Sequence, residues 1–198
     1  YKNILNYKKT LTFKAFKKSK YFSLKYFNYF PIYDSLLTRF RNKKIIFVEI
    51  GVFSGGSLFM WRNFFGKKAK IIGIDLNPDI KRFEKYGFDI LIGDQSRDDF
   101  WNKFFKKYGK VDIVLDDGGH TNYQQIKTVN NCIPNIRDGG ILITEDTHTS
   151  YMKKKGFDTY GIEVAKKARK LSKKNHKLLV KDSLSKLNEN NFDVITMW

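Results

Sequence analysis

The chain has 198 residues, of which 41% are apolar and 16% aromatic, so it is long and apolar enough to bury a core and lacks the composition of a disordered chain. No apolar run approaches the roughly 20 residues that a membrane-spanning helix needs. A single cysteine, Cys132, excludes a disulfide framework and a thiolate zinc site, and it favours a protein of the cytoplasm.

The formal net charge is +18, from 38 lysines and arginines against 20 acidic residues. Such an excess is typical of proteins that bind a polyanion, such as nucleic acid, an anionic membrane surface or a phosphorylated substrate. Bias toward AT-rich codons is the other interpretation, because Lys, Asn, Ile, Phe and Tyr are abundant together. The lysines are spread along the chain and do not form one stripe, which favours codon bias.

Residues 1–40 are basic and aromatic, and we expect them to form an N-terminal helical cover before one α/β domain over residues 41–198. Leu11, Ala15 and Phe16 have helical spacing. Pro31 is expected to break the chain before a second short helix over residues 33–40. The cover is expected to pack on a sheet edge; a lid over a pocket or a membrane-surface helix is the alternative.

From residue 45 onward, short apolar runs alternate with helical patterns. The apolar runs cover residues 45–50, 71–76, 88–92, 111–115, 140–144 and 192–198. The helical patterns cover residues 57–65, 98–108, 123–132 and 162–174. Continuous apolar runs are typical of buried parallel strands, and alternation with helices is typical of a sheet covered on both faces. The pattern predicts a Rossmann-like α/β fold with a doubly wound, mostly parallel sheet.

The first strand-to-helix turn, EIGVFSGGS at residues 49–57, predicts a ligand at the carboxyl end of the sheet. Its glycines allow a tight turn and a close approach of the backbone. Phe53 occupies the second glycine position of the dinucleotide pattern, so no pyrophosphate is expected, and no lysine follows as it does in a phosphate-binding loop. Glu49, two residues before the first glycine, suits a cationic, zwitterionic ligand.

Two further acids follow the next strands. Asp75 ends the second run, 24 residues after Gly51, where a carboxylate usually accepts hydrogen bonds from ribose hydroxyls. Asp94 follows the third run and is expected to reach the adenine edge, with Gln95 or Ser96 beside it. Together, these features indicate an adenosine that carries an amino-acid tail, as in S-adenosylmethionine.

A second group of acids follows the fourth and fifth runs. Successive strand residues face opposite sides, so Asp116 and Asp117 are expected to diverge, one toward the cofactor and the other toward the substrate. Asp117 would then converge with Glu145 and Asp146, because the two strands are expected to be neighbours about 4.8 Å apart. Three carboxylates in a small volume repel one another, and a divalent cation with oxygen ligands relieves that repulsion. Mg²⁺ is the natural candidate.

Two histidines follow the same strands. His120 lies one glycine turn beyond Asp117, where an imidazole can act as a general base near neutral pH. His148 follows the fifth run and is a candidate on the substrate side. For both residues, a hydrogen-bonded loop histidine is the alternative interpretation.

Residues 31–151 resemble the metal-dependent sugar O-methyltransferases of the macrocin and mycinamicin type. The resemblance rests on EIGVFSGGS (49–57), GIDLNP (73–78), GDQS (93–96), DIVLDDGGH (112–120) and GGILITEDTHTSY (139–151). It implies the class I methyltransferase fold and a Mg²⁺-dependent transfer of methyl from S-adenosylmethionine to a hydroxyl of a sugar or glycosylated small molecule. A related group of cephalosporin-tailoring hydroxylases shows that the substrate and even the reaction do not follow from the fold alone.

The resemblance also implies roles for individual residues. The magnesium ligands correspond to Asp117, Glu145 and Asp146, and the base corresponds to His120. The expected cofactor-binding residues are Glu49, Gly51, Ser54, Gly55, Asp75, Asp94, Gln95 and Asp116. Tyr151 and His148 are expected on the substrate side. Methyltransferases of this class usually finish with an antiparallel strand, and that strand is expected to be missing here.

Three other functions compete with this one. A nucleic-acid methyltransferase would explain the net charge, but the chain has no Asn-Pro-Pro-aromatic tetrad and no cysteine beside the cofactor turns. A non-catalytic cofactor-binding protein would leave the acid cluster unexplained. An NAD-dependent oxidoreductase conflicts with Phe53 in the glycine turn. We expect a small-molecule or glycan substrate, no membrane span and a homo-oligomer.

Overall fold

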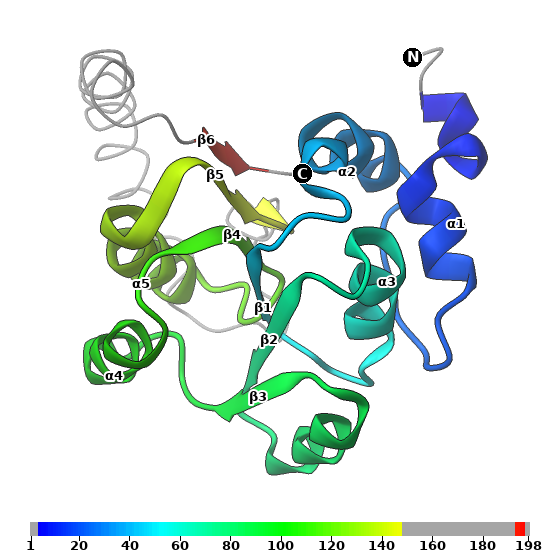
Figure 1. Ribbon diagram of the computed structural model, residues 1–198. Coiled ribbons are helices and arrows are strands. Elements are labelled where there is room, and N and C mark those ends of the chain that lie inside the picture. Colours follow the sequence, from blue (N-terminus) through cyan, green and yellow to red (C-terminus); the bar gives the residue numbers. More distant parts are fainter. Residues whose placement is uncertain (1–3, 148–192, 197–198) are drawn as a thin grey trace, which may run out of the picture. The chain divides into compact units, whose positions relative to one another are not determined.

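The computed structural model describes residues 4–147 and 193–196 (Figure 1). The chain divides into two compact units, residues 1–93 and residues 94–198. Each unit is considered by itself. Within the residues that the structure describes, no helix has the length and apolar character needed to cross a membrane.

The first unit contains three parallel strands in the order β3-β2-β1: β1 (Ile46–Ile50), β2 (Lys70–Asp75) and β3 (Asp89–Ile92). The register pairs Ile50 with Ile74 and Asp75 with Ile92, so the three carboxyl ends lie at one edge. The runs predicted at 45–50, 71–76 and 88–92 are confirmed to within one residue. Most positions of β1 and β2 are buried, which explains their nearly continuous apolar sequence.

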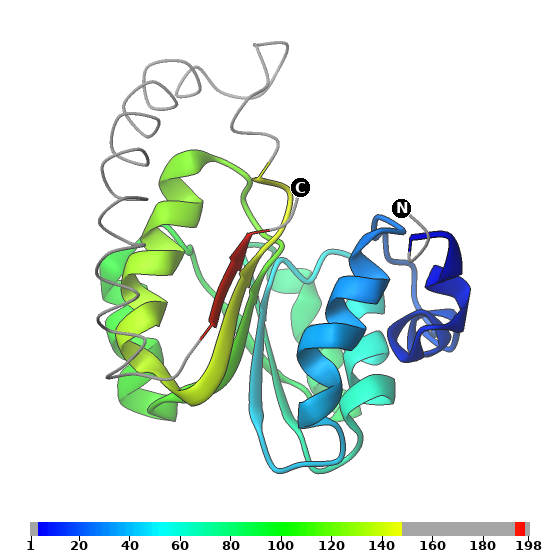
Figure 2. The ribbon, with the colours of Figure 1, turned by 90° about the horizontal axis from the view of Figure 1, so that it is seen from above.

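Helix α3 (Gly56–Phe65) connects β1 to β2 (Figure 2). Its aromatic rings pack against β1. Trp61 and Phe65 are fully buried, and each has its ring centroid 5.0 Å from that of Phe47 on β1. The predicted apolar face, formed by Leu58 together with Trp61 and Phe65, is therefore confirmed.

The 3₁₀ helix η3 (Pro78–Tyr86), between β2 and β3, is an element that the sequence pattern did not predict. The side chain of Asn77 caps it by accepting a hydrogen bond from the backbone nitrogen of Asp79 at 2.9 Å. Only Ile80 and Phe83 are buried in a mostly charged segment, so the apolar periodicity is too sparse to indicate a helix.

The N-terminal segment forms η1 (Ile4–Lys9), α1 (Leu11–Lys17), α2 (Tyr29–Leu37) and η2 (Thr38–Phe40). The expectation that Pro31 breaks the chain is wrong, because α2 begins two residues earlier. Pro31 occupies the first turn, where a backbone N–H has no partner within the helix and proline is tolerated. The buried ring of Tyr33 lies 5.1 Å from Trp61 of α3, so these helices pack on α3 within the first unit (Figure 2). Their role as a cover stays a prediction.

The second unit contains three parallel strands in the order β4-β5-β6: β4 (Val111–Asp116), β5 (Ile136–Thr144) and β6 (Asp193–Thr196). Helices α4 (Asp98–Tyr108) and α5 (Asn122–Cys132) lie on one face of these strands, and η4 (Ile133–Asn135) precedes β5 (Figure 2). Strand β5 begins four residues before the predicted run at 140–144. The predicted α/β alternation is confirmed, and all strand pairs described within the two units are parallel. The helix expected at 162–174 lies outside the described residues.

Candidate functional site

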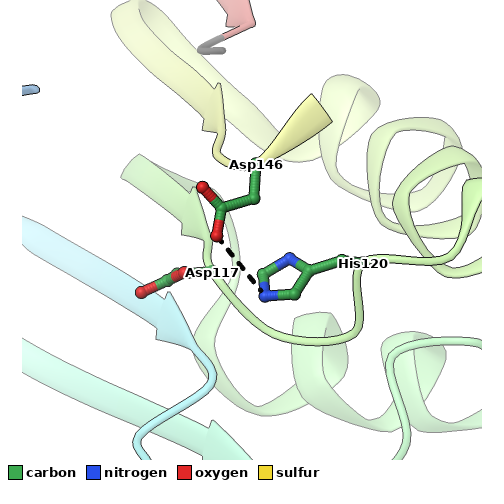
Figure 3. A group of neighbouring side chains, drawn as sticks. All are labelled: Asp117, His120 and Asp146. Carbon is green, nitrogen blue, oxygen red and sulfur yellow. Dashed lines mark ion pairs between the residues drawn. The ribbon is translucent and has the colours of Figure 1, made fainter. Parts of the chain in front are cut away.

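Three side chains of the second unit form a cluster whose groups can hold a metal ion: Asp117, His120 and Asp146 (Figure 3). One ligand atom from each residue lies within 4.8 Å of the others, and Nε2 of His120 is 3.7 Å from Oδ2 of Asp146. All three side chains are partly buried. The structure thus brings together the predicted base and two of the three predicted magnesium ligands.

The turns after β4 and β5 build this cluster. Asp117 directly follows Asp116, the last residue of β4, and the backbone nitrogen of Glu145 donates a hydrogen bond to the oxygen of Asp116 at 2.8 Å. Asp146 then has a φ of 54°, a left-handed conformation that few non-glycine residues adopt. Its carboxylate points toward His120 (Figure 3). Such local strain is typical of functional sites, where surrounding contacts hold it in place.

Glu145, the third predicted ligand, lies between β5 and Asp146 and is almost entirely buried. Its backbone oxygen accepts a hydrogen bond from Nε2 of Gln125 at 3.0 Å, which ties the turn to α5. Glu145 is not part of the three-residue cluster, and its role as a metal ligand stays a prediction.

Asp116, a predicted cofactor contact, is a buried carboxylate at the end of β4. Nε2 of Gln95 lies 3.0 Å from each of its oxygens, and Oδ1 also accepts a hydrogen bond from the backbone nitrogen of Gly118 at 3.3 Å. Burial raises the pKa of Asp116 to about 6, and the hydrogen bonds oppose that rise because they favour the ionised form.

Gln95 has a structural role that the sequence analysis missed. Its side chain is buried, and besides Asp116 its Nε2 donates to Oγ1 of Thr128 at 2.9 Å. Its Oε1 accepts a hydrogen bond from the backbone nitrogen of Gly119 at 2.6 Å, one residue before His120. Gln95 therefore joins β4, α5 and the turn that carries the histidine. Its position directly after Gly93 and Asp94 indicates a polar role. Sequence spacing alone does not tell whether the side chain contacts a cofactor or holds the turn before His120.

In the first unit, the carboxylate of Asp75 closes the turn that follows β1. Its Oδ2 accepts hydrogen bonds from the backbone nitrogens of Val52 at 2.8 Å and Phe53 at 3.0 Å. Its Oδ1 accepts one from the backbone nitrogen of Asn77 at 3.0 Å. A carboxylate has about four acceptor positions, so these three bonds leave room for one more donor.

The same turn needs left-handed backbone at three positions: Gly51 with a φ of 87°, Phe53 with 49° and Gly55 with 83°. A Cβ at position 55 would also collide with the ring of Phe83, so only glycine fits there. Ser54, another predicted cofactor contact, lies in this turn and is partly buried.

Glu49 is fully buried and is held by α3. Its Oε2 accepts a hydrogen bond from Oγ of Ser57, and its Oε1 accepts one from Nε1 of Trp61, both at 2.9 Å. These bonds explain how a carboxylate is tolerated inside the unit. They also give Glu49 a structural role, and its contact with a cofactor stays a prediction.

Three candidates remain: Asp94 on the cofactor side, and His148 and Tyr151 on the substrate side. Oδ1 of Asp94 accepts hydrogen bonds from the backbone nitrogen of Ser96 at 2.8 Å and from its hydroxyl at 2.7 Å, which fixes the turn after β3. His148 and Tyr151, the substrate-side candidates, lie outside the described residues.

The two carboxylates of the cluster suit a divalent cation, and the imidazole beside them can act as a further ligand or as a base. Ligands on opposite sides of Mg²⁺, each at about 2.1 Å, are about 4.2 Å apart. Ligand atoms that lie within 4.8 Å of one another can therefore reach one ion with small side-chain movements. Carboxylate oxygens also favour Mg²⁺ or Mn²⁺ over softer metals. The residues present thus fit a magnesium site.

Known proteins resemble the segment of the chain that carries this cluster. The protein-family model described as "Methyltransferase domain" matches residues 48–147, which run from within β1 through β5 and include the whole three-residue cluster. Mycinamicin VI 2''-O-methyltransferase of Micromonospora griseorubida is 34% identical over 143 residues, covering 67% of this chain and 35% of that protein. Demethylmacrocin O-methyltransferase of Streptomyces fradiae is 33% identical over 147 residues, covering 71% and 36%. The chain thus spans about a third of the length of these relatives.

A solved structure shows the same fold. MycE methyltransferase from the mycinamycin biosynthetic pathway, in complex with Mg, SAH and mycinamycin VI, aligns with a TM-score of 0.63 at 28% identity. The alignment covers 76% of this chain and 41% of that one. Since the family model spans more than half of the 198 residues, the chain belongs to the methyltransferase-domain family and has its Rossmann-like α/β fold.

Proposed function

We propose that this protein is a Mg²⁺-dependent O-methyltransferase that moves the methyl group of S-adenosylmethionine to a hydroxyl of a sugar or glycosylated small molecule. The observation that carries the proposal is the cluster of Asp117, His120 and Asp146, located inside the segment that matches the methyltransferase family. The relatives include Mycinamicin VI 2''-O-methyltransferase. A further relative, 30% identical over 130 residues, is named as the 2'-O-methyltransferase of 8-demethyl-8-alpha-L-rhamnosyl tetracenomycin-C of Streptomyces olivaceus, and both names support a glycosylated acceptor.

On the cofactor side, the turn after β1 and the carboxylate of Asp75 would hold S-adenosylmethionine. Asp75 keeps one acceptor position beside its three backbone hydrogen bonds, and a ribose hydroxyl can donate there. The glycines at 51 and 55 let the backbone approach the ligand closely. Glu49 is proposed as a further contact, and the expectation that Asp94 and Asp116 contact the cofactor stays a prediction.

On the acceptor side, Asp117 and Asp146 would hold the magnesium ion, with Glu145 as the proposed third carboxylate. The ion would supply Lewis-acid polarisation of the acceptor hydroxyl. His120 would accept the proton of that hydroxyl, and the carboxylate of Asp146, 3.7 Å from its Nε2, is placed to attract the imidazolium that forms. S-adenosylmethionine would supply the methyl group: the acceptor oxygen would bond to the methyl carbon as the carbon–sulfur bond breaks and S-adenosylhomocysteine leaves. Alignment of the two substrates would contribute much of the rate.

A methyl-transfer assay tests the proposal. It uses isotope-labelled S-adenosylmethionine and a panel of rhamnosides, other glycosides and free sugars. We expect labelled product with Mg²⁺, none after EDTA, and recovery when Mg²⁺ is restored. Asp117→Asn should behave like the EDTA-treated protein. Transfer that persists in EDTA would refute the metal requirement, and labelling of RNA or DNA with no labelling of any glycoside would replace the sugar with a nucleic-acid acceptor.

A further inference from the structure

The segment that connects α1 to α2, residues 19–27, lies across the glycine turn of the first unit. The hydroxyl of Ser19 donates a hydrogen bond to the backbone oxygen of Gly56 at 2.8 Å. The backbone nitrogen of Gly56 donates to the oxygen of Phe22 at 3.2 Å. The hydroxyls of Tyr21 and Tyr86 are 2.7 Å apart. A Cβ at position 56 would collide with the segment's carbonyl groups, so the two chains are in tight contact.

This connecting segment exposes an apolar ridge. Phe22, Leu24 and Tyr26 occupy alternate positions outside any helix or strand, and 54–70% of each is exposed, while the residues between them are partly buried. Phe27 follows, and the exposed ring of Phe53 lies 6.3 Å from that of Phe22. These five residues are half of the ten large hydrophobic side chains that the described part of the chain exposes. Exposed apolar groups gathered in this way usually mark an interaction surface.

The same part of the chain is strongly basic. The first 33 residues contain eight lysines and no acidic residue. Lys14, Lys17, Lys18 and Lys20, which lie just before the ridge, are all exposed. Along the sequence, the apolar ridge is therefore directly preceded by exposed positive charge.

We propose that the ridge and its lysines bind the surface of an anionic lipid bilayer. Aromatic rings and leucine enter the boundary between headgroups and acyl chains, and lysines are attracted to anionic lipids. A nucleic acid would use the lysines and the rings, but not Leu24, which is the most exposed of the five residues. Two copies of the chain that met at this ridge would bring their basic segments together, and the two positive charges would repel each other.

Such binding would bring the membrane surface next to the turn that we assign to the cofactor. An acceptor sugar attached to a lipid would then reach the enzyme at the bilayer. This consequence rests on the proposed function, whereas membrane binding itself does not.

Sedimentation with vesicles tests the proposal. We expect the protein to pellet with equimolar phosphatidylglycerol and phosphatidylcholine, to stay in solution with phosphatidylcholine alone, and to be released as salt is raised. The double variant Phe22→Ser/Leu24→Ser should weaken binding about tenfold. Replacing Lys17, Lys18 and Lys20 by glutamine should weaken it about 100-fold, at about fivefold for each lysine.

Matched controls separate this surface from a general effect of charge or hydrophobicity. Leu76→Ser removes a leucine that is 61% exposed elsewhere in the first unit. The triple variant of Lys106, Lys107 and Lys110 to glutamine removes three exposed lysines at the end of α4 and after it. Both controls should keep wild-type binding and an unchanged melting temperature.

The proposal is wrong if the protein binds both vesicle types equally, or if the control variants lose as much binding as the test variants. It is also wrong if Phe22→Ser/Leu24→Ser binds vesicles like the wild type, or if the wild type self-associates and this double variant does not. If the lysine variant alone loses binding and RNA displaces the vesicles, the surface is a polyanion site. Failure of the proposed function would appear separately, as vesicle binding without methyl transfer to any glycoside.

Discussion

Asp146 shows how a single residue combines an unusual backbone with a predicted ligand role. Its φ of 54° is tolerated by asparagine much better than by most residues. Asp146→Asn should therefore keep the fold and lose metal affinity, whereas Asp146→Ala should lose metal affinity and also about 1 kcal/mol of stability. Titration with Mn²⁺, followed by electron paramagnetic resonance, and thermal unfolding would measure both effects. An Asp146→Asn variant that binds Mn²⁺ like the wild type would contradict the ligand assignment.

A single variant of His120 can show whether its imidazole acts as a general base or as a metal ligand. As a general base, it should contribute about 10²–10⁴-fold to turnover and little to metal binding. His120→Ala should then retain Mn²⁺ affinity and S-adenosylhomocysteine binding while kcat falls by that factor. A His120→Ala variant that loses Mn²⁺ binding together with activity would make the imidazole a metal ligand, which the distances in the cluster also permit.

Gln95 is predicted to position the turn that carries His120. Gln95→Ala removes the acceptor for the nitrogen of Gly119 and the donor to Asp116, so buried polar groups lose their partners. We expect the free energy of unfolding in urea to fall by about 1–3 kcal/mol and Mn²⁺ affinity to fall about tenfold or more. Asn130→Ala, at an exposed position of α5, is the control and should leave Mn²⁺ affinity unchanged. Equal Mn²⁺ affinity in Gln95→Ala and wild type would remove the positioning role.

At the scale of elements, the N-terminal helices depend on one acidic residue. Asp34 of α2 accepts hydrogen bonds from the backbone nitrogens of Leu11 at 2.6 Å and Thr12 at 2.9 Å, so it caps α1 from a neighbouring helix. Asp34→Ala should lower stability by about 1–2 kcal/mol, as loss of a helix cap does. Ser35→Ala, at an exposed position beside it, should change stability far less. Comparison of the two variants by thermal unfolding would check this, and equal melting temperatures would show that the cap does not stabilise the fold.

Most elements could be predicted because buried parallel strands and amphipathic helices leave strong periodic patterns. The strands β1 to β4 and the helices α3, α4 and α5 lie within about one residue of their predicted bounds. The errors arose where local rules compete. Pro31 is a helix breaker in the interior but is accepted in a first turn, and η3 buries too few residues to show a period. The cap from Asp34 joins residues that are 22 and 23 positions apart, which no local pattern signals.

At the scale of the whole molecule, the site could be predicted in part because parallel strands expose their last residues at one edge of the sheet. That rule led to Asp75 in the first unit and to Asp117 and Asp146 in the second. The same rule says nothing about hydrogen bonds between distant side chains, so the link from Gln95 to Gly119 was missed. The acceptor depends on the shape of a pocket and not on acids at strand ends, so the sequence indicates only its class.

Cys132 provides a probe of the second unit, because it is the only cysteine of the chain and is fully buried in α5. Burial raises the pKa of its thiol well above 9, so the folded protein keeps the proton that the unfolded chain releases near that value. The contribution of this thiol to stability is therefore present below about pH 9 and is lost as the pH rises above it.

Labelling with a disulfide reagent at pH 8 should accordingly be at least about 100-fold slower in the native protein than in urea, which corresponds to an opening free energy of about 3 kcal/mol. Cys132→Ala is the control for background reaction and should show none. If the native protein reacts as fast as the unfolded chain, α5 does not shield its cysteine in solution. The packing of α5 in this structure, which also brings Thr128 to Gln95, would then not hold in solution.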